Sequence, residues 1–133
     1  MPEIDGRARD LLEAPNFCHV ATLRADGSAH VVPVWVDTDG EHVVLNSAEG
    51  RVWVRNADRD PRVTCTVSNR DNPYEYVTIT GTVAERTHDG ADAHIDAMAR
   101  KYLGEDTYPS RRPAEQRVIF RVRPDRVRVH GSG

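Results

Sequence analysis

The sequence is poor in several features that define whole classes of protein. Its 133 residues include only two cysteines, and Lys101 is the single lysine. The 18 basic residues are fewer than the 21 acidic ones, so the formal net charge is −3, which argues against a broad positive surface for nucleic acid. No apolar run approaches the roughly 20 residues that span a membrane, and the first residues lack the apolar segment of a signal peptide. We therefore expect a protein that binds neither nucleic acid nor membranes.

The residues that most often carry catalysis are also few or scattered. Cys18 and Cys65 both fall in strand-like segments, and two buried thiols fit the reducing cytoplasm better than a disulfide scaffold. The six histidines show no metal-ligand spacing, so we expect no metal site. The sequence has no nucleophile elbow, phosphate-binding glycine loop or dinucleotide fingerprint. A reaction on this chain would therefore depend on a bound cofactor.

What the sequence does contain is a series of short alternating segments. Its length fits one domain over residues 1–133. Alternation of apolar and polar residues between turn residues predicts strands at residues 17–24, 29–37, 42–47, 62–68, 74–87, 117–123 and 127–130. Helical spacing predicts helices at residues 4–14 and 90–101, the second capped by Asp89. Six or seven antiparallel strands with short helices make a mainly β fold, and a small barrel would remove the exposed edges.

Two strands and one loop have unusual composition. Residues 29–37 are apolar on both faces, which favours a central strand, yet Pro33 lies in the middle. This proline indicates either a bulge where the sheet opens toward a ligand or an edge strand protected against aggregation. Gly81 predicts a bend or bulge within residues 74–87. The polar residues 104–115 predict a lid or a dimer arm.

Residues 46–63 predict a short helix between two strands. Ser47 is a suitable N-cap, and Pro61 ends the helix because proline lacks an N–H group. Arg51, Arg55 and Arg59 are spaced four apart, so they share one face. Together with the positive end of the helix dipole, they would bind a phosphate or a carboxylate-rich tail. The alternative is a solvated face neutralised by nearby carboxylates, those of Glu49, Asp58 and Asp60.

Several short motifs, taken in order, resemble one family. They are residues 21–27 (ATLRADG), 30–35 (HVVPVW), 46–51 (NSAEGR), 55–56 (RN), 60–63 (DPRV) and 76–81 (YVTITG). Their order and spacing, over nearly the whole chain, resemble the pyridoxamine-phosphate-oxidase-like proteins, whose fold is the FMN-binding split β-barrel. Within them the chain is most similar to the flavin/deazaflavin oxidoreductases of actinobacteria that use coenzyme F420. The implied fold is a six- to seven-stranded antiparallel split β-barrel.

The resemblance also implies a homodimer with the cofactor in a groove between the subunits. The planar ring would rest against residues 30–35, and the phosphate would bind at the helix that follows the third strand. The implied cofactor-binding residues are His30, Val31, Val32, Pro33, Val34, Trp35, Asn46, Ser47, Arg51, Val52, Trp53, Arg55, Asn56, Tyr74 and Tyr76. The two tyrosines would cover the ring or reach it from the partner subunit. Family members often carry a lysine where Trp53 stands, so Arg51 or Arg55 would replace its contact.

The activity that the resemblance implies is hydride transfer between the deazaflavin and an unsaturated small organic acceptor. Tyr76 and His30 are the candidate proton donors. The acceptor would lie in a pocket formed by Trp35, the region of Tyr74 and residues 104–115.

Two other functions fit the same fold. One is an FMN flavoprotein of the pyridoxamine phosphate oxidase type, and the other is a non-catalytic protein that binds F420 or a tetrapyrrole. FMN carries one compact phosphate, whereas F420 carries a phosphodiester and a chain of glutamates. The arginines on and after the helix, which include Arg59 and Arg62, favour this longer ligand.

Overall fold

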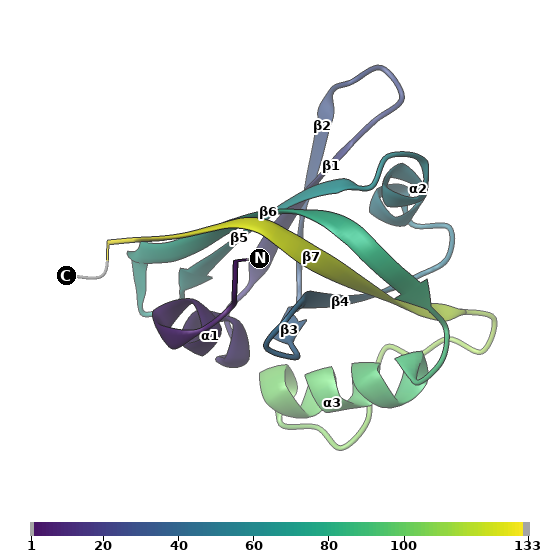
Figure 1. Ribbon diagram of the computed structural model, residues 1–133. Helices are drawn as coiled ribbons and strands as arrows, with labels where there is room; N and C mark the ends of the chain where they lie inside the picture. The colour runs from purple at the N-terminus through teal and green to yellow at the C-terminus, as the bar shows by residue number, and fades with distance from the viewer. Residues whose placement is uncertain (1, 132–133) are drawn as a thin grey trace.

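The structure is a computed structural model that describes residues 2–131. The predicted domain also includes Met1, Ser132 and Gly133, which lie outside the described residues. In chain order the elements are α1 (Gly6–Glu13), β1 (Cys18–Leu23), β2 (Ala29–Val34), β3 (Asp37–Thr38), β4 (Val43–Ala48), α2 (Val52–Arg59), β5 (Arg62–Asn69), β6 (Asn72–Thr87), α3 (Ala91–Leu103) and β7 (Arg117–His130). The three helices of the described residues lie around one curved sheet (Figure 1).

The seven strands form one antiparallel sheet with the order β2-β1-β5-β6-β7-β4-β3. The sheet curves into a half-barrel whose two edges are β2 and β3, and this is the split form of a β-barrel (Figure 1). The prediction of a mainly β fold with six to seven antiparallel strands is therefore confirmed. The two predicted strands at residues 117–123 and 127–130 are a single strand, β7.

A bulge explains why β7 continues through Pro124. Gly81 of β6 lies opposite Pro124, whereas Thr80 lies opposite Arg126, so the pairing shifts by one residue at this point. A Cβ atom at Gly81 would approach the carbonyl oxygen of Arg123 to 2.5 Å, which no real side chain tolerates. The predicted bulge at Gly81 is confirmed, and it lets the two long strands bend without losing their pairing.

The prediction that residues 29–37 form a central strand is wrong. In the described part of the chain β2 pairs with β1 alone, in unbroken register from Cys18 opposite Val34 to Leu23 opposite Ala29. The edge-strand interpretation of Pro33 is confirmed, and no bulge accompanies the proline. An edge strand accepts a proline because one of its sides needs no ladder hydrogen bonds.

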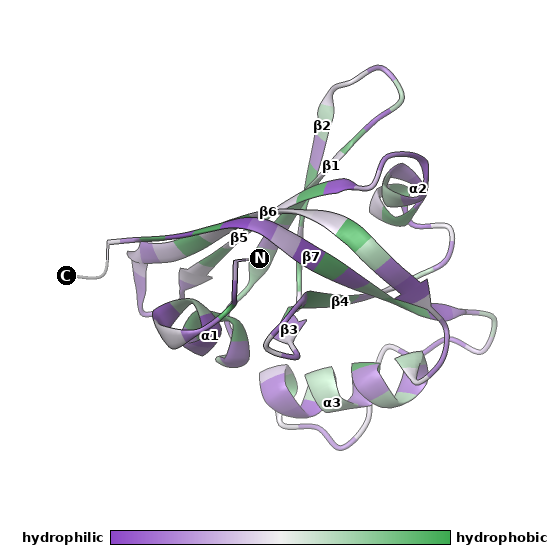
Figure 2. Ribbon diagram, in the orientation of Figure 1, coloured by the Kyte–Doolittle hydropathy of each residue, from purple (hydrophilic) through white to green (hydrophobic). Residues whose placement is uncertain are grey.

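The core lies between the concave side of the sheet and the helices α1 and α2. Leu11 and Leu12 of α1, Val54 of α2 and Phe120 of β7 are almost completely buried there. Figure 2 shows hydrophobic and hydrophilic residues alternating along β6 and β7, as expected for strands with one buried face. The burial of apolar side chains, at about 25 cal/mol per Å², supplies most of the stabilisation that such a domain needs.

The third helix packs against β4 and β7 through a separate face. Ala91, Ile95, Met98 and Ala99 are buried on this face. The helix begins after Gly90, whose φ is +75°, and no side-chain cap is present, so the predicted Asp89 cap is wrong. A glycine in the left-handed conformation reverses the chain there without the strain that a side chain would bring.

The two cysteines are buried and free. A hydrogen bond with Cys65, together with burial, raises the pKa of the Cys18 thiol well above its ordinary value, so this thiol stays protonated and unreactive. Among residues 2–131, no helix is long and apolar enough to cross a membrane.

Candidate functional site

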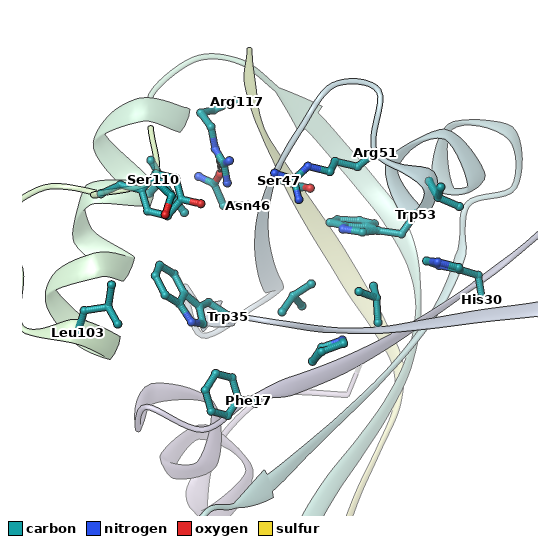
Figure 3. Close-up of a pocket in the computed structure, with 16 residues that line it drawn as sticks. Phe17, His30, Trp35, Asn46, Ser47, Arg51, Trp53, Leu103, Ser110 and Arg117 are labelled. Carbon is teal, nitrogen blue, oxygen red and sulfur yellow. Dashed lines mark hydrogen bonds between the residues drawn. The ribbon is translucent and has the colours of Figure 1, made fainter. Parts of the chain in front are cut away.

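A cavity of about 550 Å³ opens between β2, β4, the start of α2 and the loop that precedes β7. This volume is within the range typical of small-molecule and cofactor sites. Figure 3 shows the labelled side chains pointing inward from elements that are far apart in the sequence. The lining residues are Phe17, His30, Val32, Pro33, Val34, Trp35, Asn46, Ser47, Arg51, Val52, Trp53, Ile95, Leu103, Tyr108, Ser110 and Arg117.

One wall of the cavity is apolar and flat. It comes from Val32, Pro33 and Val34 of β2 and from Trp35, which directly follows the strand. The indole of Trp35 stacks on Tyr102, with 5.1 Å between the ring centroids and 6° between the planes. The ring of Tyr108, from the loop before β7, meets Trp35 edge-on at 5.9 Å. This wall offers a planar ligand a surface that does not compete for hydrogen bonds.

Buried polar contacts hold Trp35 in place from behind. The hydroxyl of Tyr102 accepts a hydrogen bond from the N–H of Val36 at 3.0 Å and donates to the carbonyl of Asn16 at 2.5 Å. Lys101 donates to the carbonyls of Leu12 and Val36, both at 2.6 Å. Burial raises the pKa of Tyr102 and lowers that of Lys101. The only lysine of the chain therefore ties α3 to the segment after β2 and does not face a ligand.

The opposite end of the cavity is the start of α2. The predicted N-cap, Ser47, is wrong, because Ser47 lies within β4, opposite Val118. Arg51 is the N-cap, and its side chain makes no capping bond. The first helical bond runs from the N–H of Arg55 to the carbonyl of Arg51 at 3.1 Å, so the three preceding N–H groups have no acceptor inside the helix. Such an end attracts anions.

Two arginines of the cavity lining share one carboxylate, that of Glu115. Arg51 was expected there, but Arg117 was not, because its side chain comes from the first residue of β7. The guanidinium of Arg117 is buried, donates from Nη1 to Glu115 at 2.7 Å and lies over the Tyr108 ring at 5.2 Å. The other oxygen of Glu115 is 3.6 Å from Arg51. Two cations thus share one carboxylate, so this end of the cavity keeps a positive charge.

Asn46 connects Arg117 to α3 behind the cavity. Its side-chain oxygen accepts from Nε of Arg117 at 3.0 Å, and its amide nitrogen lies 2.9 Å from the carbonyl of Ala91 and 3.0 Å from Nδ1 of His94. The other ring nitrogen of His94 is 3.2 Å from Asp37. Burial raises the pKa of Asp37, but the hydrogen bonds from His94 and Thr38 and the charge of Lys101 outweigh it, and the pKa is lowered.

Most of the residues implied by the family resemblance come together at the cavity. They are His30, Val32, Pro33, Val34, Trp35, Asn46, Ser47, Arg51, Val52 and Trp53. The Nδ1 atom of His30 is buried and has no hydrogen-bond partner among the described residues. In Figure 3, His30 and Trp53 lie on the opposite side of the cavity from Ser110 and Arg117. Trp53 is buried and packs on Phe120 with 5.0 Å between ring centroids.

Five other implied residues do not line the cavity. Val31 alternates outward from β2 and is 59% exposed, and Arg55 is exposed on the outer side of α2. Asn56 is buried, where it donates to the hydroxyl of Thr22 at 3.2 Å. Tyr74 is 82% exposed and Tyr76 stacks on His130, with both tyrosines on β6. Neither tyrosine is part of the cavity lining formed by the described chain.

The loop between α3 and β7 supplies residues that sequence reasoning placed only as a segment. Tyr108 and Ser110 line the cavity, together with Leu103 at the end of α3. The loop is held by Arg111, which bonds to Asp96 at 2.6 Å, and by the N–H of Tyr108, which donates to Asp96 at 2.9 Å. The expected pocket formed by Trp35 and residues 104–115 is therefore present in the chain, whereas Tyr74 lies elsewhere.

Comparison with known proteins agrees with this geometry. A family model described as "Pyridoxamine 5'-phosphate oxidase" matches residues 4–131. A solved structure described as "F420 Reductase" is 33% identical, covers 90% of this chain and 94% of its own, and has a TM-score of 0.79. None of the curated proteins compared with the chain matches it.

Two more distant structures share the fold. The conserved hypothetical protein Rv2991 from Mycobacterium tuberculosis is 20% identical, with coverage of 96% of this chain and 86% of that one and a TM-score of 0.71. Protein Atu2129 from Agrobacterium tumefaciens, of unknown function, is also 20% identical, with coverage of 94% and 55% and a TM-score of 0.74. At this level of identity the likeness concerns the fold alone.

Proposed function

Because the chain belongs to the pyridoxamine 5'-phosphate oxidase family, we propose that it is an oxidoreductase that uses coenzyme F420. It transfers a hydride between the deazaflavin and an unsaturated small organic acceptor. One observation carries the proposal: a flat apolar wall and a cationic helix start face the same cavity. The 33% identity to a protein described as "F420 Reductase" supports F420 as the cofactor.

The residues present fit a planar cofactor with an acidic handle. The wall of Val32, Pro33, Val34 and Trp35 suits an aromatic ring system. The N–H groups at the start of α2, with Arg51 and Arg117, suit a phosphate or carboxylates. His30 offers a buried ring nitrogen without a partner among the described residues, which a polar edge of the cofactor would satisfy.

When bound, F420 supplies the hydride chemistry through its deazaflavin ring. Arg51 and Arg117 hold the acidic handle and so fix the cofactor along the cavity. The apolar side chains of β2 exclude water from one side of the ring. His30 is the titratable group of this wall and can hold a proton there. Tyr76 can act as a proton donor only from a partner subunit, since it lies off the cavity of its own chain.

We also propose that two copies of the chain form the working unit. Three large apolar side chains stand exposed where the cavity opens: Phe17 at 48%, Val52 at 51% and Leu103 at 51%. Tyr74 is exposed at 82% on the long strand β6. Exposed apolar groups of this size are typical of surfaces that a partner covers. Light scattering of the purified protein should give twice the mass of one chain, and a monomer would contradict the proposal.

The cofactor is tested by titrating the purified protein with F420 and with FMN. We expect saturable quenching of F420 fluorescence and weaker binding of FMN, because FMN carries one phosphate and no glutamate chain. Reduced F420 should then be oxidised when a conjugated acceptor is added. Stoichiometric FMN with no F420 binding would assign the site to a flavoprotein. F420 binding without oxidation across a broad acceptor panel would assign it to a carrier.

A further inference from the structure

His94 lies behind the cavity wall and does not line it. Its ring nevertheless contacts Asn46, which lines the cavity and accepts a hydrogen bond from Arg117. On its other side the ring meets Asp37 at 3.2 Å. The His94 side chain is 15% exposed, and that of Asp37 is 33% exposed.

The contacts fix the protonation state of His94. Arginine can only donate hydrogen bonds, so the atom of Asn46 that faces Nε of Arg117 must be its oxygen. The amide nitrogen then donates one hydrogen to the carbonyl of Ala91 and the other toward Nδ1 of His94. Nδ1 must accept and therefore carries no proton, while Nε2 donates to the carboxylate of Asp37. His94 is neutral in this arrangement.

A second proton on His94 is incompatible with these contacts. It would set an N–H of the ring against the amide N–H of Asn46, 3.0 Å away. Turning the Asn46 amide over would satisfy His94 but would put its oxygen against the carbonyl of Ala91 and its nitrogen against Arg117. Two hydrogen bonds would be lost for one gained. Either response, the N–H repulsion or the turned amide, disturbs the bonds of Asn46, so protonation of His94 would weaken the contact between Asn46 and Arg117.

We propose that neutral His94 is a positioning residue that holds Asn46 and, through it, Arg117 toward the cofactor's acidic handle, so that acidification weakens cofactor binding. This inference rests on the proposed function, because Arg117 has to face the cofactor. The charged groups around His94 are Asp37 from β3, Lys101 from α3 near Asp37, and Arg117 with Glu115 beyond Asn46.

The first test compares F420 affinity across pH in the wild type, His94→Asn and His94→Ala. The phosphodiester of F420 does not titrate in this range, which makes F420 a better probe than FMN. Between about pH 8 and about pH 5 the wild type should lose about tenfold in affinity, the effect of one charge-assisted hydrogen bond. The asparagine side chain of the first variant keeps an acceptor near the position of Nδ1 and does not titrate, so this step should be absent. The alanine variant should bind weakly at both pH values.

His30 also faces the cavity, and it is present in all three proteins. The contribution of His94 is the difference between the wild-type and His94→Asn curves, so any contribution of His30 cancels. Identical curves for these two proteins would overturn the proposal. So would full affinity of His94→Ala at both pH values.

The second test uses the protein without any cofactor. Long-range nitrogen–proton NMR of the His94 ring should show a bare Nδ1 and a protonated Nε2 at neutral pH, and the Asn46 amide signals should shift together with its titration. A proton on Nδ1 at neutral pH would overturn the inference. If F420 fails to bind at any pH, the proposed function fails, while this spectrum still decides whether His94 positions Asn46.

Discussion

The arginines near α2 fall into two groups that look alike in sequence and differ in surroundings. Arg59, at the end of the helix, donates to the carbonyl of Leu23 at 2.8 Å and to the side chain of Asn56 at 3.0 Å. Arg62 makes two hydrogen bonds to Asp60, at 2.7 and 3.0 Å. Arg51, before the helix, has only a 3.6 Å contact with Glu115 among the described residues. The same residue type therefore supports the fold at one end and remains available to a ligand at the other.

This difference teaches that spacing predicts a shared face but not the partners on it. The acceptors that occupy Arg59 come from β1 and from one turn earlier in α2, where the fold brings carbonyl and amide oxygens together. At the start of the helix only N–H groups are free, so nothing in the described chain satisfies a guanidinium there except Glu115. A ligand anion is attracted to that end because the first N–H groups of the helix have no acceptor within it and Arg51 has only a 3.6 Å contact with Glu115.

The largest expected effect comes from replacing the buried Trp53 in the first turn of α2. Trp53→Lys restores the residue type common in the family, but the indole is buried against Phe120. Loss of this packing should lower the free energy of unfolding by about 3 kcal/mol or more, measured by urea denaturation. The exposed neighbour Val52 provides the control, since Val52→Lys should leave stability nearly unchanged. Equal stability of the two variants would show that Trp53 is not part of the core.

The next largest effect concerns Arg117. Arg117→Met keeps much of the side-chain volume and removes the charge, so F420 affinity should fall by about 2 kcal/mol, or roughly 30-fold. Arg123→Met is the matched control, because Arg123 is on the same strand but pairs with Asp125 outside the cavity. Isothermal titration of both variants decides the matter. A similar loss of F420 affinity in both variants would show that binding depends on the net charge of the protein and not on the position of Arg117.

The comparison of the two groups is sharpened by Arg51→Ala and Arg59→Ala. We expect about tenfold weaker F420 binding for the first and less than roughly a twofold change for the second, because Arg59 is occupied by Leu23 and Asn56. The second should instead lower thermal stability slightly. The reverse order of affinities would place the acidic handle at the end of α2 and contradict the assignment.

The smallest expected effect is the pH dependence that the ion pair of Asp60 and Arg62 gives to the free energy of unfolding. The hydrogen bonds from Arg62 lower the pKa of Asp60 from 3.8 to about 2. The folded state therefore favours the carboxylate, and the stabilisation is present above about pH 4 and lost as the pH falls through about 2. Because the Arg62 side chain is 72% exposed, the effect is small. The stability difference between the wild type and Asp60→Asn should shrink over this range, and a constant difference would refute the pairing.

Much of the fold was predictable because alternation and turn residues report directly on strands. The bulge at Gly81 was predictable for the same reason, since a glycine inside a strand marks a close backbone approach. The edge position of β2 was not predictable from the sequence. An apolar strand at the edge resembles a central strand when its outer face borders a cavity. Ser47 resembled a helix cap only because the sequence does not show that β4 continues to Ala48.

The candidate site was predictable in part. The β2 wall and Arg51 follow from local motifs, whereas Arg117 enters the cavity only because β7 pairs with β4 and places it opposite Ala48. The role of His94 was not predictable, because its contact with Asn46 joins residues 48 positions apart. A weak signal existed for Arg117, an arginine that starts a strand directly after a long polar loop.

The most direct test of the whole account is the F420 dissociation constant of two double variants measured side by side. The first double variant, Arg51→Ala with Arg117→Met, removes the two arginines that line the cavity. The second, Arg59→Ala with Arg62→Ala, removes two arginines whose hydrogen bonds are made within the chain. With folding verified by circular dichroism, we predict a loss of roughly 100-fold or more for the first pair and less than about threefold for the second. Equal losses, or undiminished binding by the first double variant, would contradict the claim that the start of α2 holds the cofactor's acidic handle.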